Sequence, residues 1–390
     1  MIEKREDGTV AISGRIDSKN AQEFEEELLA ACPVNEEVHI DASELSYISS
    51  AGLRVFMKLK KTVKQEVYVE NVSKEIYDIF EVTGFVDILE VHKQLRQISV
   101  DGCEVVGEGA NGKVYRLDDE TIIKVFAPGV SMDIVKEERD IAQAAFVSGV
   151  PTAISYDVAR VGDSYGAVYE MLHAKTLSSV VMEKPELAEE MGRRMGKLLK
   201  ELHETPANTA KLTDMLAVYK DRARKMEKYL TDKEFEKLVS VYEVLSNQQT
   251  MLHGDYHAKN IMYMDGELIF IDMGDAGYGH PFLDIGGSYL GMMHVGKTNP
   301  DAVIKYIGVD YETVKILWKN MLLEYFGEKD FEEGNKLAEI YGEAKYMLMP
   351  FVYTKMTDEM AWALIERTRQ NGFISEDFDI GPALNRTILL

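Results

Sequence analysis

The stretch MLHGDYHAKNIMY, residues 251–263, places a polar centre between two apolar ends. The apolar ends predict short strands or a buried hairpin. Polar side chains inside such a hairpin must satisfy their hydrogen bonds or take part in chemistry. Asp255 and Asn260 stand five residues apart in this centre. The roles of these two side chains therefore indicate the fold and the chemistry of most of the chain.

The composition is that of an acidic globular protein. Its 390 residues include 67 Asp and Glu against 44 Lys and Arg, a net charge of −23, and 46% are hydrophobic. This length predicts two or three domains, and the acidic balance argues against nucleic acid or an anionic membrane as a partner. The N-terminus has no apolar signal core, no segment is apolar over the roughly 18 residues that span a bilayer, and Cys32 and Cys103 form no CxxC pattern. We therefore expect a cytoplasmic protein.

The first hundred residues alternate between strand and helix patterns. The expected elements are strands at 9–16, 37–43 and 66–72 and helices at 18–32, 49–63 and 73–85. Ser18 is the expected cap of the first helix. The alternation predicts a small α/β domain over residues 1–95.

The segment IDASELSYISSAGLRVFMKLKK (40–61) resembles the STAS domain of anti-sigma-factor antagonists. In that family a Ser in a D-S-S/T-G-L pattern is phosphorylated by a partner kinase. Aligned on Gly52-Leu53, that residue is Ser50, and Ser49 replaces the preceding Asp. The resemblance implies a regulatory domain that binds a regulatory protein. A phosphate on Ser50 would lie at a helix start, where backbone N–H groups favour negative charge; alternatively, Ser49 or Ser50 simply caps the helix.

A glycine-rich segment follows in CEVVGEGANGKVYRL (103–117). Its G-x-G-x-x-G spacing also occurs in dinucleotide-binding folds, but there a helix follows, and here the pattern predicts two strands joined by a turn at 118–120. A glycine-rich β-hairpin with a Lys on the next strand is the arrangement of kinases, in which these residues bind ATP. The corresponding residues are Gly107, Gly109, Gly112, Val114 and Lys124.

The pattern at 131–151 predicts a helix that could pair with Lys124, because a Lys in an apolar strand needs an anionic partner. Glu138 is the first candidate and Glu137 the second; alternatively, either lies on a solvated helix face. The expected inner face holds Ile134, Ile141, Ala145 and Phe146.

The next strand, at 165–172, carries Glu170 and Met171 near its end. This matches the junction where kinases bind adenine with backbone groups, so we expect Glu170 and Met171 in the ATP site.

In HGDYHAKN (253–260), Asp255 and Asn260 have the H-x-D-x-x-x-x-N spacing of a kinase catalytic loop. Asp255 would accept or orient the proton of the attacking hydroxyl. Asn260 and Asp272, at the end of the next apolar strand, would bind Mg²⁺, which prefers hard oxygen ligands. The order of these motifs predicts a kinase fold.

The details around Asp272 resemble the aminoglycoside phosphotransferase and choline kinase superfamily, over roughly residues 100–370. The sequence IDMGDA replaces D-F-G, there is no A-P-E, and GHPFLDIG follows at 279–286. The resemblance implies that Asp284 anchors the catalytic loop, and His253 is expected to support the same loop. The expected fold class is an α/β STAS domain (1–95) followed by an α+β bilobal protein-kinase-like domain, with an N-lobe at 96–173 and a mostly helical C-lobe at 174–390.

The function expected from these motifs is ATP- and Mg²⁺-dependent phosphoryl transfer to a hydroxyl acceptor, coupled to a STAS regulatory domain. The acceptor, a small molecule or a protein, stays open at this point. One alternative is a signalling Ser/Thr protein kinase or partner-switching antagonist with phosphorylation at Ser50. A further alternative is a pseudokinase that binds ATP without transferring phosphate.

Overall fold

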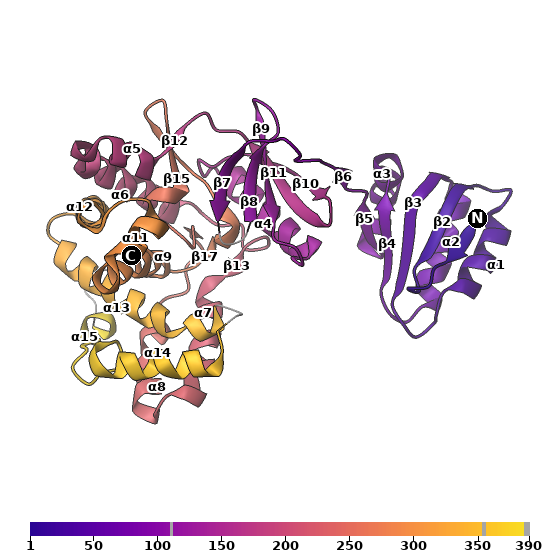
Figure 1. Ribbon diagram of the computed structural model, residues 1–390. Helices are drawn as coiled ribbons and strands as arrows, with labels where there is room; N and C mark the ends of the chain where they lie inside the picture. The colour runs from indigo at the N-terminus through magenta and orange to yellow at the C-terminus, as the bar shows by residue number, and fades with distance from the viewer. Residues whose placement is uncertain (110–111, 353–355, 386–390) are drawn as a thin grey trace. The chain divides into compact units, whose positions relative to one another are not determined.

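Two separate hydrophobic cores divide the chain into the units Met1–Ile98 and Ser99–Leu390 (Figure 1). The computed structural model describes residues 1–109, 112–352 and 356–385. Within these ranges, each helix is too short or too polar to cross a membrane.

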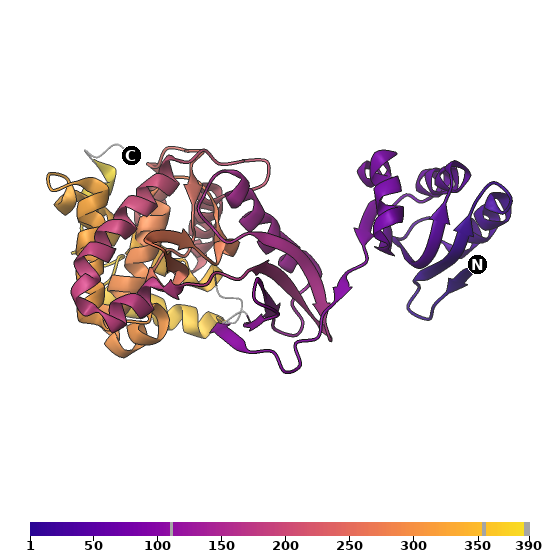
Figure 2. The same ribbon diagram turned by 90° about the horizontal axis from the view of Figure 1, so that it is seen from above.

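The first unit is a five-stranded sheet with the strand order β1-β2-β3-β4-β5. Strands β2 to β5 pair in parallel and β1 is antiparallel to β2. Three helices lie along one side of the sheet, as Figure 2 shows, and bury one apolar face each in a common core. The elements are β1 (Ile2–Lys4), β2 (Val10–Ile16), α1 (Ala21–Ala31), β3 (Val38–Ile48), α2 (Ser50–Thr62), β4 (Val67–Val72), α3 (Lys74–Val82), η1 (Phe85–Asp87), β5 (Glu90–Lys93) and β6 (Arg96–Gln97).

The start of α1 differs from the prediction. The helix begins at Ala21 behind Asn20, and not behind Ser18. The side chain of Asn20 accepts a hydrogen bond from the backbone N of Asp17 and donates one to the carbonyl of Arg15. These bonds close the turn before the helix, so the expected Ser18 cap is wrong.

Ser49 and Ser50, at the start of α2, have different roles. Ser49 is the N-cap, and its hydroxyl accepts hydrogen bonds from the backbone N of Ala51 at 3.2 Å and of Gly52 at 3.4 Å. Ser50 follows in the first turn with an exposed side chain. A Cβ at Gly52 would lie 2.7 Å from Cγ2 of Ile16, so this end of α2 packs directly on β2.

The two cysteines have different surroundings. Both are free thiols. Cys32, just after α1, is buried, and its burial raises the pKa of the thiol to about 11. Cys103 is half-buried and precedes β7.

The second unit begins with antiparallel strands in the order β10-β11-β9-β8-β7, with α4 packed against β10 and β11. Beyond β11 the chain is mainly helical and carries the small β12-β15-β16 and β13-β17-β14 sheets (Figure 1). The elements up to the polar stretch at 253–260 are β7 (Val105–Gly109), β8 (Gly112–Arg116), β9 (Thr121–Phe126), α4 (Met132–Val147), β10 (Ser155–Val161), β11 (Ser164–Glu170), β12 (Lys175–Thr176), α5 (Leu177–Glu183), η2 (Pro185–Leu187), α6 (Ala188–Glu204), β13 (Thr213–Asp214), α7 (Met215–Lys225), η3 (Met226–Tyr229), α8 (Asp232–Glu243) and β14 (Met251–Leu252). The remaining elements are η4 (Ala258–Asn260), β15 (Ile261–Met264), β16 (Glu267–Phe270), η5 (Met273–Asp275), β17 (Gly277–Tyr278), α9 (Phe282–Tyr289), the π-helical η6 (Leu290–His294), α10 (Val295–Thr298), α11 (Pro300–Ile307), α12 (Tyr311–Phe326), α13 (Phe331–Met347), η7 (Met349–Phe351), α14 (Asp358–Asn371) and α15 (Gly381–Leu384).

Helices α6 and α12 pack with their backbones in close approach. A Cβ at Gly196 would lie 2.3 Å from the carbonyl oxygen of Met321, and one at Gly192 would lie 2.7 Å from that of Leu317. These glycines let the two backbones approach, and α6 thereby presents the side chain of His203 near its C-terminal end to the interior.

Helix α4 buries Ile141 and Ala145 as expected, but not Ile134 and Phe146. Its inner residues include Val135 and Ala142, whereas Ile134 is 53% and Phe146 is 42% exposed. Val135, Glu138 and Ala142 follow the i, i+3, i+7 spacing of a single helix face. The prediction was wrong for Ile134 and Phe146, and the true face is centred near Glu138.

We predict that Ser49→Ala destabilises the start of α2 and that Ser50→Ala does not. Loss of an N-cap side chain typically costs about 1 kcal/mol, because it leaves backbone N–H groups without an acceptor. Hydrogen–deuterium exchange of the α2 peptide and the free energy of unfolding in urea would measure both variants. Equal effects of the two substitutions would contradict the assignment of the cap.

Candidate active site

The polar loop, residues 253–260, is held by a buried carboxylate. Asp284, in the first turn of α9, is 2% exposed. Its Oδ2 accepts a hydrogen bond from the backbone N of His253 at 2.6 Å, and its Oδ1 accepts one from the backbone N of Gly254 at 2.7 Å. Burial acts to raise the pKa of Asp284, but the hydrogen bond and charge of His203 act against it and leave the pKa below its usual value. Asp284 therefore anchors the start of the loop as a charged group.

Two buried histidines surround this anchor. His203 on α6 places Nε2 3.2 Å from Oδ2 of Asp284, and its Nδ1 lies 2.8 Å from the hydroxyl of Tyr325. His253 is fully buried, and its Nδ1 accepts a hydrogen bond from the backbone N of Asp255 at 3.3 Å. Burial lowers the pKa of His253, so its ring is neutral at pH 7 and acts as an acceptor inside the loop.

Gly254 allows the polar loop to lie against the segment that follows Asp272. Its φ is +86°, and a Cβ there would lie 2.1 Å from the carbonyl oxygen of Asp275 in η5. A larger residue would be strained by this φ and would also collide with the carbonyl group. The close approach brings the two sequence motifs into one site.

The carboxylate of Asp255 is engaged at both oxygens. Oδ2 accepts a hydrogen bond from Nδ2 of Asn260 at 3.2 Å and lies 3.4 Å from Nε2 of His257. Oδ1 accepts a hydrogen bond from the hydroxyl of Tyr306 at 2.5 Å. Burial acts to raise the pKa of Asp255, but His257 and then Tyr306 lower it well below its usual range. Asp255 is therefore ionised at neutral pH and can accept a hydrogen bond from a bound hydroxyl group.

The strands β15 and β16 place Asn260 and Asp272 side by side. Ile261 pairs with Phe270 in this hairpin, and the backbone N of Ile271 donates to the carbonyl of Asn260 at 3.0 Å. Asp272 follows with φ 59°, a left-handed conformation that is uncommon for a residue other than glycine. Its side chain is 49% exposed, so the carboxylate faces an accessible space.

Lys124 joins three elements of the site. Its Nζ on β9 lies 2.7 Å from Oε1 of Glu138 on α4 and 2.7 Å from Oδ1 of Asp272 after β16. Burial acts to lower the pKa of Lys124, but the negative charges of Asp272 and Glu138 raise it above the usual value. The amino group is therefore a fixed positive charge beside the half-exposed Asp272 carboxylate.

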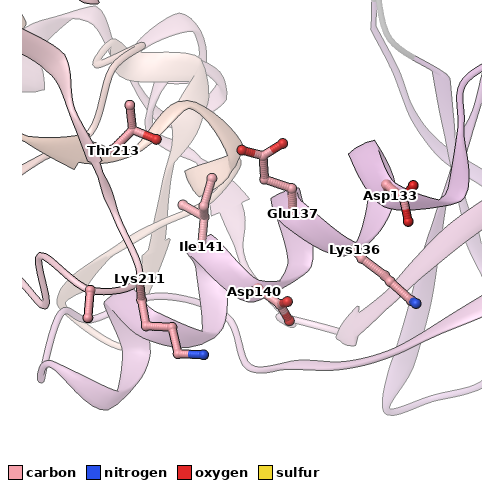
Figure 3. A pocket seen from close by; sticks show the side chains of 8 residues that line it. Asp133, Lys136, Glu137, Asp140, Ile141, Lys211 and Thr213 are labelled. Atoms are coloured by element: carbon pink, nitrogen blue, oxygen red, sulfur yellow. The ribbon is translucent and has the colours of Figure 1, made fainter. Parts of the chain in front are cut away.

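The neighbouring Glu137 lies elsewhere. It points into a separate cavity of about 310 Å³ between α4 and the segment before β13, which Figure 3 shows. Consecutive residues on a helix point about 100° apart, so only one of the two glutamates can face Lys124. The structure brings Glu138 to Lys124 and leaves Glu137 outside the site. The cavity is lined by Asp133, Lys136, Glu137, Asp140, Ile141, Ala210, Lys211 and Thr213.

The glycine-rich hairpin stands across the sheet from Lys124. Gly107 pairs with Val114, and Val114 pairs with Lys124, so these three residues form one row over β7, β8 and β9. Gly109 pairs with Gly112 at the end of the hairpin. A Cβ at Gly112 would lie 2.0 Å from the carbonyl oxygen of Val125, so only glycine fits there.

The structure places Glu170 and Met171 at the end of β11, but their backbone N–H groups are already bonded. The N of Glu170 donates to the carbonyl of Ile154 at 2.9 Å, and the N of Met171 donates to that of Glu120 at 2.8 Å. The side chain of Glu170 accepts from the backbone N of Ile154. These two N–H groups therefore do not face a ligand. Met171 lines a cavity of about 550 Å³ with Leu172, His173, Ala174, Lys175, Tyr263, Met264 and Asp265.

Four residues that contact or influence the site were not identified from the sequence. Asp275 lies close to Asp255 and Asp272, and its pKa is raised by burial and by these two negative charges. Asp275 could have been noticed three residues after Asp272. The others come from distant segments and carry no local signal: they are His203, Tyr306 and Lys345, whose Nζ donates to the carbonyl of Gly254 at 3.4 Å.

Comparison with known proteins finds a match in each unit. Residues 102–322 match the phosphotransferase enzyme family, and residues 2–90 match a STAS domain. The first unit is similar to a putative anti-sigma factor antagonist, BtrV, of Bordetella bronchiseptica, with 36% identity over 84 residues that cover 20% of this chain and 72% of that protein. It is also similar to the anti-sigma-B factor antagonist of Bacillus subtilis, with 32% identity over 85 residues that cover 21% and 78% of the two chains.

Two solved structures resemble the chain at low identity. One is a choline/ethanolamine kinase family protein from Mesorhizobium loti, with 14% identity and a TM-score of 0.48, covering 73% of this chain and 91% of that chain. The other is the ADP-bound aminoglycoside phosphotransferase APH(2'')-Ib, with 16% identity and a TM-score of 0.45, covering 77% and 97%.

The family match spans more than half of the chain and contains each residue of the site from Gly107 to Asp284. It confirms the resemblance and the fold class that the order of the motifs predicted. The chain therefore belongs to the phosphotransferase enzyme family and carries a STAS domain in its first unit.

Proposed function

We propose that the chain transfers the γ-phosphoryl group of ATP to a hydroxyl acceptor in a Mg²⁺-dependent reaction. The observation that carries this proposal is the position of Lys124, whose Nζ lies 2.7 Å from both Glu138 and Asp272. A strand Lys fixed by a helix Glu is the arrangement with which kinases hold ATP phosphates. Here the same Lys also lies beside the carboxylate that the sequence predicts to bind metal.

The residues present fit a divalent metal ion and its nucleotide. Asn260, just before β15, and Asp272, just after β16, offer oxygen donors, and the negative charges of Asp255 and Asp272 raise the pKa of the nearby Asp275. When bound, Mg²⁺ held by Asn260 and Asp272 would neutralise phosphate charge. Lys124, kept in place by Glu138, would supply a further positive charge to the phosphates.

Asp255 would act on the acceptor. Its ionised carboxylate accepts hydrogen bonds, and the Asp284 anchor fixes the loop that carries it. A hydroxyl that donates to Asp255 would be oriented for attack and would lose its proton to the carboxylate as the new phosphorus–oxygen bond forms. The adenine would lie near Met171, held by contacts other than the N–H groups of Glu170 and Met171.

We predict that Asp255→Ala lowers phosphoryl transfer by about two to four orders of magnitude, because a positioned base contributes that much to such reactions. ATP affinity should change little, since the carboxylate acts on the acceptor side. ADP release with a panel of amino alcohols, amino sugars and Ser peptides would measure transfer, and calorimetry would measure ATP binding. Transfer at the wild-type rate would exclude Asp255 as the base.

We predict that Glu138→Gln weakens Mg²⁺-ATP binding or turnover by about ten-fold or more, because Lys124 loses the charged partner that fixes it. The matched control is Glu137→Gln, on the same helix but facing the separate cavity, which should behave as wild type. Both variants remove one charge and keep the side-chain shape. Equal effects in calorimetry and ADP release would show that Lys124 does not depend on Glu138.

A second candidate function is signalling through Ser50. The observation that favours it is that Ser50 is exposed in the first turn of α2 while Ser49 makes the cap bonds. Phosphorylation would add nearly two negative charges at a helix N-terminus that tolerates them, and would change the surface offered to a partner. The partner would be a regulatory protein of the kind that binds anti-sigma-factor antagonists, and the acceptor hydroxyl would belong to a STAS domain.

We predict for this second function that incubation of the full chain with Mg²⁺ and ATP places phosphate on Ser50. Mass spectrometry of the peptide that covers residues 42–54 would detect it, and the Asp255→Ala protein should lack it. Ser49→Ala controls for the choice between the two serines. Phosphate found only on an added small molecule, with Ser50 unmodified, would contradict the signalling role.

A further inference from the structure

The hydroxyl of Tyr306 is hydrogen-bonded to one carboxylate oxygen of Asp255, the proposed base. It donates a hydrogen bond to Oδ1 of Asp255 at 2.5 Å, while Asn260 and His257 lie on Oδ2. An acceptor that reacts by the proposed mechanism must donate its own hydroxyl to the same carboxylate. Tyr306 therefore makes, from within the chain, the hydrogen bond that an acceptor would make.

The structure holds a defined place for this ring. A Cβ at Gly291 would lie 2.8 Å from Cε1 of Tyr306, so the absence of a side chain in the π-helical segment η6 leaves room for the ring. On another side, the ring centroid of His257 lies 4.8 Å from that of Tyr306, and the two ring planes make an angle of 63°. The contact of Tyr306 with Asp255 is thus supported by packing as well as by its hydrogen bond.

The ring can leave this place without unfolding the helix that carries it. Helix α11 is anchored by Val303 and Ile307, which are fully buried, whereas Tyr306 is 42% exposed. Rotation of the side chain would break the bond to Asp255 and keep the anchors of the helix in the core. Oδ1 of Asp255 can therefore become available to an acceptor through a side-chain rotation alone.

We propose that Tyr306 is a specificity-determining residue. Its hydroxyl keeps water from the acceptor position at Oδ1 of Asp255, and only an acceptor that displaces the tyrosine ring gains this position. This inference rests on the proposed phosphotransferase function. Water is a small hydroxyl donor at very high concentration, and its attack on ATP would waste the nucleotide. A bulky acceptor can offer contacts that replace those of the tyrosine ring, and water cannot.

The test is the rate of ATP hydrolysis in the absence of any added acceptor, measured as ADP release by the full chain with Mg²⁺. Tyr306→Phe removes the hydroxyl and Tyr306→Ala removes the ring as well. We expect ATP hydrolysis to rise roughly ten-fold or more in both variants, because water then no longer competes with a hydrogen bond from Tyr306 to the charged Asp255 carboxylate. The double variant Tyr306→Phe with Asp255→Ala should lose the gain. Tyr311→Phe, a tyrosine whose ring lies on Gly296, is the matched control and should leave hydrolysis unchanged.

Each other outcome overturns a stated part of the inference. Hydrolysis could be unchanged or lower in both Tyr306 variants, while calorimetry shows retained ATP binding and the melting temperature is preserved. This result would show that Tyr306 positions Asp255 and does not exclude water from it. Phosphate on Tyr306 itself, found by mass spectrometry, would make it an acceptor and overturn the role proposed here. Absence of Mg²⁺-ATP binding by the wild-type chain would overturn the proposed function, and the role of Tyr306 with it.

Discussion

The hydrogen bonds of Asp284 with the start of the polar loop are the interaction on which the site depends. A carboxylate that is 2% exposed cannot remain charged without partners, and the backbone N of His253 and of Gly254 are two of them. The dependence is mutual, because movement of the loop would leave the buried charge without its donors. Helix α9 thus fixes the backbone immediately before Asp255, and the side chains of the loop are presented from a rigid base.

Much of this site could be predicted from the sequence because each motif joins a residue type to a local element. A Lys between apolar neighbours on a strand needs an anion, and Glu138, on the helix that follows, is the first candidate that the sequence offers. The spacing of Asp255 and Asn260, followed by an apolar strand that ends in Asp272, likewise depends on the short β15–β16 hairpin.

Contacts between distant segments could not be predicted in this way. Tyr306 follows Asp255 by 51 residues, and the pattern of its helix indicates only which residues face the core. Backbone groups of Glu170 and Met171 were expected to bind adenine, but the sequence does not show that the register of the sheet and the turn before β9 give the two N–H groups partners inside the chain. The face of α4 was also misjudged at Ile134, because exposure there depends on where the helix crosses the sheet.

The unlike surroundings of the two cysteines offer a means to observe the glycine-rich hairpin in solution. With a pKa of about 11, the buried Cys32 is almost entirely in its thiol form at neutral pH and reacts slowly with alkylating reagents. Cys103 is partly accessible and stands two residues before the first strand of the hairpin. A maleimide fluorophore would therefore attach mainly at one position, and the natural sequence already provides a single-site optical reporter beside the strand that carries Gly107 and Gly109.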